Sequence, residues 1–170
     1  NDILNVLNDV KKYNSDISIT SLDVTKIEDK DFEAIDKFKP THIFYYATPF
    51  IFSGKKNKFS KEIYHNFRIY YLDAFEIIVK RLVKHNTNMS ILYPSSVAVE
   101  ENPSDMLEYS QAKKEGEKLC LELIKKYSNI KILCPRLPRL ETDQTVSLSS
   151  VKNEDPMQIL DIIRSLKNKS

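Results

Sequence analysis

The sequence predicts an α/β protein with a doubly wound parallel sheet. Short runs rich in β-branched and aromatic residues alternate with longer segments whose apolar residues recur every three or four positions. Strands that are separated by helices pair in parallel through right-handed crossovers. The length of 170 residues suits one domain, and a hydrophobic content of 41% suffices for a folded core. We therefore treat residues 1–170 as a single domain.

The first part of the chain gives four predicted elements. Apolar residues at helical spacing predict a helix over residues 2–13, and residues 17–22 follow as a short strand. Residues 31–38 predict a short helix that Pro40 ends, because the residue before a proline avoids the helical region. Residues 42–47 read His-Ile-Phe-Tyr-Tyr-Ala, which is typical of a strand buried on both faces.

The second part predicts two long helices, each followed by a strand. Residues 61–85 form the first predicted helix, and residues 90–94 form the strand after it. Pro94 cannot donate a ladder hydrogen bond, so this strand is expected to end early. The remaining elements are a helix over 108–127, a strand over 130–134, a loop over 140–155 and a terminal amphipathic helix over 159–166.

Composition restricts the classes of function. Twenty-six basic and 24 acidic residues leave a net charge of only +2, which gives no sign bias for nucleic acid or a membrane surface. The most apolar stretch, residues 43–52, is too short to span a bilayer, and the N-terminus lacks a signal-peptide pattern. Cys120 and Cys134 form neither a CxxC pair nor a zinc motif, so no metal is expected and the compartment is predicted to be the reducing cytoplasm.

Glycine is scarce in this chain. Gly54 and Gly116 are its two glycines, whereas an average protein carries about 7% glycine. Tight turns and close approaches of the backbone to a ligand normally need this residue. Any glycine-dependent ligand turn is therefore predicted to lie outside the chain, which begins with Asn1 and has the look of a segment of something longer.

Three polar residues form a candidate catalytic group. Tyr109 and Lys113 are four positions apart on a predicted helix, so their side chains share a face. A neighbouring ammonium lowers a phenol pKa, which would make Tyr109 a proton donor or acceptor near neutral pH. Ser96 stands at the end of an apolar strand, where parallel sheets gather their ligands. Taken separately, the pair could be an ordinary surface pair and Ser96 an ordinary turn residue.

With these motifs in this order, the sequence resembles the short-chain dehydrogenase/reductase family, in an atypical branch similar to epimerases and dehydratases. Ser96, Tyr109 and Lys113 match its catalytic serine, tyrosine and lysine. The resemblance implies that Tyr109 is the general acid/base, that Lys113 lowers its pKa and holds the nicotinamide ribose, and that Ser96 positions the substrate carbonyl. Asn66 matches the helix asparagine of the family's proton relay.

The same resemblance implies a nicotinamide cofactor, NAD or NADP, and a small-molecule substrate. Leu-Asp-Val-Thr at 22–25 resembles the acidic motif near the adenine ring, and Tyr-Tyr-Ala-Thr-Pro at 45–49 takes the place of a segment beside the cofactor. Cys-Pro-Arg-Leu-Pro at 134–138 resembles the segment near the nicotinamide. The implied cofactor-binding residues are Asp23, Val24, Ala47, Thr48, Lys113, Pro135 and Arg136.

The family's Rossmann-like sheet would be incomplete in this chain. The sequence has no glycine-rich fingerprint, so we expect the first two strands of the order 3-2-1-4-5-6 to precede Asn1. They would come from an upstream segment or from another chain. In the alternative, the sheet rearranges so that the strand at 17–22 pairs with the strand at 42–47.

Two functions fit these observations. The first is an NAD(P)-dependent oxidoreductase, either a ketoreductase or an epimerase-like enzyme, that acts on a carbonyl, alcohol or sugar within a larger protein or complex. The second is a non-catalytic Rossmann-like module that binds a partner, which the low glycine count supports. The resemblance also implies a homodimer through the two long helices, where Tyr70, Tyr71 and Phe75 would contact a second copy or face the sheet.

Overall fold

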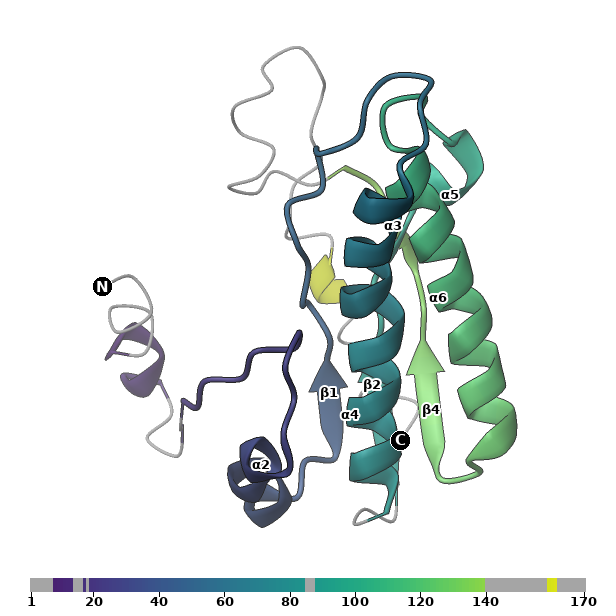
Figure 1. Ribbon diagram of the computed structural model, residues 1–170. Coiled ribbons are helices and arrows are strands. Elements are labelled where there is room, and N and C mark those ends of the chain that lie inside the picture. The colour runs from purple at the N-terminus through teal and green to yellow at the C-terminus, as the bar shows by residue number, and fades with distance from the viewer. Residues whose placement is uncertain (1–7, 14–16, 18, 85–87, 140–158, 162–170) are drawn as a thin grey trace.

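The fold is an α/β arrangement built on a parallel sheet (Figure 1). Strands β1 (His42–Phe44), β2 (Met89–Leu92) and β4 (Ile130–Leu133) lie in this order and pair in parallel throughout. The predicted class and the parallel pairing are therefore confirmed. The computed structural model describes residues 8–13, 17, 19–84, 88–139 and 159–161.

Pro94 separates β2 from the short strand that follows it. Beyond β2 and β4 the chain continues as β3 (Ser95–Ser96) and β5 (Arg136–Leu137), which also pair in parallel. The amides of Tyr93 and Ser95 donate toward the β4–β5 side. Backbone N–H groups of successive residues in a strand point to opposite edges, so the N–H that Pro94 lacks would have pointed toward β1. Pairing with β1 accordingly stops, and the prediction that this strand ends early is confirmed.

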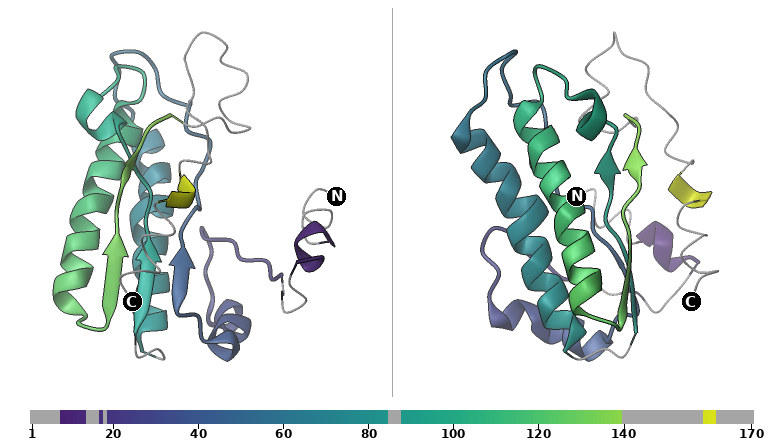
Figure 2. Two further views of the ribbon diagram at one scale, coloured as in Figure 1. Left: turned by 180° about the vertical axis from the view of Figure 1, so that it is seen from behind. Right: turned by 90° about the vertical axis from the view of Figure 1, so that its right-hand side faces the viewer.

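Two long helical segments cover one face of the sheet (Figure 2). The first consists of α3 (Lys61–Arg68), the π-helical turn η2 (Ile69–Asp73) and α4 (Ala74–Val83), and the second is α6 (Leu107–Lys126). Both correspond to predicted helices. The side chain of Ser60 caps α3 by accepting a hydrogen bond from the Ile63 amide at 3.4 Å.

The π-helical turn is stabilised by two buried tyrosines of the sheet. Tyr45 Oη donates to the Tyr70 carbonyl at 2.6 Å, and Tyr93 Oη donates to the Tyr71 carbonyl at 2.9 Å. A π turn widens the helix, and such turns are frequent at functional sites. Tyr71 and Phe75, with exposed fractions of 1% and 0%, pack toward the sheet rather than toward a second copy.

The predicted strand at 17–22 is wrong in its described part. Residues 17 and 19–22 have no strand conformation, and β1 pairs with β2 alone among the described strands. A strand needs a hydrogen-bonding neighbour, and the described residues provide none beside this segment. The alternative in which it pairs with β1 is therefore also not found. Phe44 and Tyr46, beside the open edge of β1, are 41% and 50% exposed.

The remaining short elements agree in part with the sequence. The helix predicted over 31–38 is formed as η1 (Asp29–Phe32) followed by α2 (Glu33–Phe38), and it ends where Lys39 takes a left-handed conformation before Pro40. Helix α5 (Ala98–Glu101) was not predicted. Of the terminal helices, residues 8–11 and 159–161 are helical; the rest of both, and the loop at 140–155, lie outside the described residues.

Replacing Gly116 by alanine should destabilise the protein by about 1–3 kcal/mol. A Cβ at this position would lie 2.0 Å from Tyr93 Oη and 2.7 Å from Tyr93 Cζ. Tyr93 is only 1% exposed, so its ring has no room to move away. In an open helix position, alanine would instead stabilise the helix by about 1 kcal/mol relative to glycine. We expect the clash with Tyr93 to outweigh this gain, so the free energy of unfolding should fall. Urea unfolding measures it, with Lys118→Ala on the exposed side of α6 as control; equal stability of both variants would contradict the packing.

Candidate active site

The buried face of α6 carries the candidate catalytic pair. Tyr109 and Lys113 are 9% and 7% exposed, and both face the sheet and the first long helix. The Tyr109 ring meets the rings of Phe67 and Tyr71 edge-on, at centroid distances of 5.7 and 5.8 Å. The interpretation of the two residues as an ordinary surface pair is therefore wrong.

Ser96 and Tyr109 are brought together from different elements. Ser96 lies at the end of β3, where its Oγ accepts the Ala98 amide at 3.2 Å, and its side chain lies close enough to Tyr109 to affect the phenol. Burial raises the pKa of Tyr109, and the Ser96 side chain opposes this only in part. The expectation that Lys113 lowers the pKa of Tyr109 is wrong for this structure, because burial of the phenol dominates. Tyr109 therefore holds its proton at neutral pH.

Lys113 is enclosed by aromatic rings. Its Nζ donates to the Pro94 carbonyl at 2.7 Å and lies 3.9 Å from the ring centroid of Tyr71. The ring centroids of Tyr93 and Tyr109 follow at 5.3 and 5.8 Å. Burial lowers the pKa of Lys113 to about 7, since removing an ammonium from water favours its neutral form. The amine is therefore poised to change charge near neutral pH.

Asn66 lies on the first long helical segment. It is exposed on α3, and its backbone carbonyl accepts the Ile69 amide at the π turn. Tyr71 is the side chain of this helix that reaches the lysine, and its Oη shares a 2.6 Å hydrogen bond with Thr48 Oγ1. The sequence placed Tyr71 on the apolar stripe but gave no sign of the π turn that sets its position. Tyr71 was thus missed as a site residue.

The predicted cofactor-binding residues fall into two groups. Ala47 and Thr48 follow β1, and Pro135 follows β4, so all three lie at the carboxyl edge of the sheet together with Ser96. The Asp23–Val24 pair lies in the segment before η1. The Asp23 carboxylate is exposed and accepts both the amide and the hydroxyl of Thr25, which lowers its pKa.

Arg136 is engaged by two carboxylates. Its Nε and Nη2 donate to the two oxygens of Glu117 at 2.7 Å each, and its Nη1 donates to Glu100. Ser95 Oγ donates to the same Glu117 at 2.6 Å. This network ties β3 and β5 to α6, so it fixes the strand of Ser96 against the helix of Tyr109. In this arrangement the guanidinium of Arg136 is committed to protein groups rather than turned toward a ligand.

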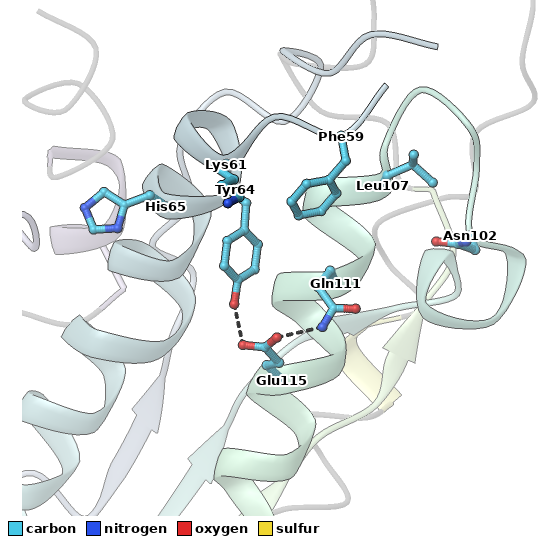
Figure 3. A pocket seen from close by; sticks show the side chains of 8 residues that line it. All are labelled: Phe59, Lys61, Tyr64, His65, Asn102, Leu107, Gln111 and Glu115. Carbon is cyan, nitrogen blue, oxygen red and sulfur yellow. Dashed lines mark hydrogen bonds between the residues drawn. The ribbon is translucent and has the colours of Figure 1, made fainter. Parts of the chain in front are cut away.

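A separate shallow hollow lies on the outer side of α3 and α6 (Figure 3). Tyr64 Oη and Gln111 Nε2 both donate to Glu115 there, so these polar groups satisfy one another. None of the candidate catalytic side chains lines it. In the part of the chain that the structure describes, we find no group of His, Cys, Asp or Glu suited to a metal ion, and no helix long and apolar enough to cross a membrane.

Comparisons with known proteins identify the fold. No family model and no curated protein matches the sequence. Among solved structures, a short chain dehydrogenase from Salmonella enterica serovar Typhi CT18 is similar, with a TM-score of 0.76 at 11% identity over 92% of this chain and 71% of the other. A 4-hydroxyisoleucine dehydrogenase in complex with NADH has a TM-score of 0.71 at 15% identity over 88% and 72%. A short chain dehydrogenase from Burkholderia cenocepacia J2315 with NADP has a TM-score of 0.71 at 10% identity over 87% and 64%.

The fold is that of the short-chain dehydrogenases. The carboxyl edge of a sheet in this fold class is where ligands bind. Two parts of this chain bear on whether it could hold a nicotinamide dinucleotide. At the carboxyl edge, Ser96 on β3 lies beside Tyr109 and Lys113 on α6. The pyrophosphate end needs a glycine turn against a helix N-terminus, whereas Gly116 lies inside α6 and Gly54 packs against the Asp105 carbonyl.

Proposed function

We propose that this protein is an NAD(P)-dependent oxidoreductase that reduces a carbonyl group to an alcohol. The observation that carries the proposal is that Ser96, Tyr109 and Lys113 lie together at the carboxyl edge of the sheet, with the side chains of Tyr109 and Lys113 buried. The three residues come from a strand end and from two successive turns of α6. A structural core gains little from burying a lysine amine and a tyrosine hydroxyl, because each costs free energy unless it is paired.

The protonation of the cluster favours reduction. A bound reduced nicotinamide supplies a hydride to the carbonyl carbon. Tyr109 keeps its proton because burial raises its pKa, so its hydroxyl can protonate the carbonyl oxygen as negative charge develops. Ser96, at the adjoining strand end, would hold the same oxygen in place. Lys113 would hold the ribose hydroxyls beside Tyr109. The charge of its amine changes near pH 7, because its pKa is about 7.

We propose that the open edge of β1 pairs with the strand that carries the glycine turn. That strand would belong to an upstream segment or to another chain. The amide of Tyr45 donates to Leu92 of β2. The backbone N–H and C=O of the preceding residue, Phe44, therefore point to the open edge. Phe44 and Tyr46 are the exposed apolar side chains beside it, which is unusual for an edge that meets solvent.

We propose a ketone as the substrate. A protonated Tyr109 fits the reducing direction, in which the phenol gives its proton to the carbonyl oxygen.

A specific observation favours the non-catalytic alternative. Arg136 lies within the segment expected beside the nicotinamide, yet its side-chain hydrogen bonds go to Glu117 and Glu100. With no glycine turn among its residues, the chain could serve as a partner-binding module of the same fold. Cofactor binding separates the two functions.

The test is a fluorescence titration of NADPH and NADH against the protein, alone and with the strand and glycine turn of a short-chain dehydrogenase fused ahead of it. We expect binding to strengthen at least about tenfold with the fusion, because the pyrophosphate then gains backbone N–H donors at a helix N-terminus. Reduction of a ketone by the fusion protein would support the proposed oxidoreductase activity. Absence of binding in both proteins, shown by circular dichroism to be folded, would leave the partner-binding module.

A further inference from the structure

The segment between β1 and α3 carries a local excess of positive charge. Residues 49–61 contain Lys55, Lys56, Lys58 and Lys61 and no acidic residue. All four lysines are exposed, and none of them forms an ion pair with a carboxylate of the described residues. The net charge of +2 does not reveal this excess, because it averages over all 170 residues.

Three of these lysines lie on a tight turn that the backbone holds in place. The Lys58 amide donates to the Lys55 carbonyl at 3.1 Å, and Asn57 takes a left-handed conformation with φ of 57°. The Asn57 amide also donates to the Ser104 carbonyl at 2.6 Å, which ties the turn to the segment before α6. The turn therefore presents Lys55, Lys56 and Lys58 together from an anchored backbone.

Exposed phenylalanines lie on both sides of this turn in the sequence. Phe50 is 60% exposed and meets the ring of Phe52 edge-on at a centroid distance of 6.0 Å. Phe59 is 46% exposed and lies against Tyr64 at 5.7 Å, at the border of the shallow hollow (Figure 3). Lysines beside exposed phenylalanines are the combination by which proteins bind the interface of an anionic lipid bilayer.

Two exposed carboxylates border the loop. Glu62 lies in the first turn of α3, and Asp105 is the residue whose backbone carbonyl packs against Gly54. They face four lysines, so the loop together with its borders keeps a positive charge.

The position of the loop favours a flat partner. In Figure 1 it forms the arch at the top of the view, where the chain passes from the carboxyl end of β1 to the start of α3. A loop that projects from the end of a molecule can meet a planar surface. Single-stranded nucleic acid, the other partner that lysines and aromatic rings suit, binds instead in a groove that follows its backbone.

We propose that the loop of residues 50–59 docks this protein on a membrane surface that contains anionic phospholipid. The lysines of the turn would lie at the negatively charged head groups, and Phe50 would enter the boundary between head groups and acyl chains. Each lysine near such a surface strengthens binding about fivefold, so that three of them contribute about 10²-fold. The docking goes beyond the proposed reductase function and does not depend on it.

The experiment sediments the purified protein with large unilamellar vesicles and measures its partition coefficient. Vesicles of phosphatidylcholine alone are compared with vesicles that contain about 30% phosphatidylserine, which gives the surface its negative potential. We expect binding to the anionic vesicles only. Sodium chloride at about 1 M should release the protein, because it shortens the range of the electrostatic attraction to about 3 Å.

Replacing the three lysines of the turn tests their part in binding. Lys55→Gln/Lys56→Gln/Lys58→Gln should lower the partition coefficient about 10²-fold. A matched control variant removes the same charge from the exposed side of α6 and should keep most of the binding. It replaces three lysines by glutamine: Lys114, Lys118 and Lys125.

Phe50→Trp tests whether the loop enters the lipid, since the chain has no tryptophan of its own. Its fluorescence emission should shift to shorter wavelength on anionic vesicles, and lipid brominated on the acyl chains should quench it. Leu121→Trp is the control, at a position that is 61% exposed on α6, and should show neither effect. Neither measurement involves the turnover of a substrate, so failure of the oxidoreductase proposal would leave the docking result unaffected.

Four outcomes would overturn the proposal. The wild-type protein, shown by circular dichroism to be folded, could fail to bind anionic vesicles. The two lysine variants could lose binding equally, which would make net charge rather than the loop responsible. The emission of Phe50→Trp could stay unchanged on vesicles that bind the protein. Finally, fluorescein-labelled oligothymidylate could bind at the same salt while the vesicles do not, which would assign the lysines to nucleic acid.

Discussion

Replacing Tyr109 by phenylalanine should lower kcat for ketone reduction about 10²–10⁴-fold, the range that a positioned general acid contributes. Phenylalanine keeps the ring that packs edge-on against Phe67 and Tyr71, so the core around it is retained. What is lost is the hydroxyl that lies close to Ser96 and that would protonate the substrate oxygen. The measurement is steady-state oxidation of NADPH or NADH in the form of the protein that binds the cofactor.

The control for this prediction lies on the same helical segment. Tyr127→Phe makes the same chemical change at the C-terminal cap of α6, five helical turns from Tyr109, and should leave kcat unchanged. Cofactor affinity should be unaffected in both variants. If Tyr109→Phe retains full turnover while the fold is intact, another group supplies the proton, and the proposed role of Tyr109 is wrong.

The order of helices and strands could be predicted because periodicity reports local burial. Residues 61–85 show one apolar stripe, and the structure buries Phe67, Tyr71, Ala74, Ile78 and Leu82 of it. The π turn inside this helix could not be predicted in the same way. It depends on two phenols, Tyr45 and Tyr93, which reach its carbonyls from distant strands. The strand at 17–22 failed for a related reason, since a pattern of residues cannot show whether a neighbouring strand exists.

Some members of the candidate site could be proposed from the sequence, whereas their charges could not. Ser96, Tyr109 and Lys113 were found from spacing and from position at a strand end, and the structure gathers them. Asn66 was placed by position along the helix, and it lies on the exposed side. The direction of each pKa depends on burial, which a spacing of four residues does not reveal. Lys113 was therefore expected to act as a cation, whereas its surroundings favour the neutral amine.

Replacing Lys113 by methionine should change how the stability of the protein depends on pH. In the folded protein the pKa of Lys113 is lowered from 10.5 to about 7 by burial. Between about pH 7 and pH 10.5 the unfolded chain thus binds one proton more than the folded chain at this residue, and stability rises with pH. Below about pH 7 both states are protonated, and the cost of burying the cation is present in full. The free energy of unfolding of the wild type, relative to Lys113→Met, should therefore increase by up to about 1.4 kcal/mol per pH unit.

Urea unfolding of both proteins from about pH 6 to about pH 9 measures this difference. Methionine has a similar length and keeps the apolar packing against Tyr71, while Lys114→Met at the neighbouring exposed position is the control and should show no such slope. The other titratable groups that face Lys113 are Tyr71, Tyr93, Tyr109, Cys120 and Cys134. They are present in both proteins, so their own titration largely cancels in the difference.

The result decides between two physical effects at one side chain. Burial favours the neutral amine, whereas the face of the Tyr71 ring, 3.9 Å from Nζ, attracts the ammonium. A cation–π contact of a desolvated lysine is worth about 2 kcal/mol, less than the several kcal/mol that burial of a charge costs. We therefore expect burial to dominate and the slope to appear. A flat difference across this pH range would mean that the ring and the Pro94 carbonyl hold Lys113 as a cation, and Lys113 would then favour loss of the proton from Tyr109 and oxidation of an alcohol instead of reduction of a ketone.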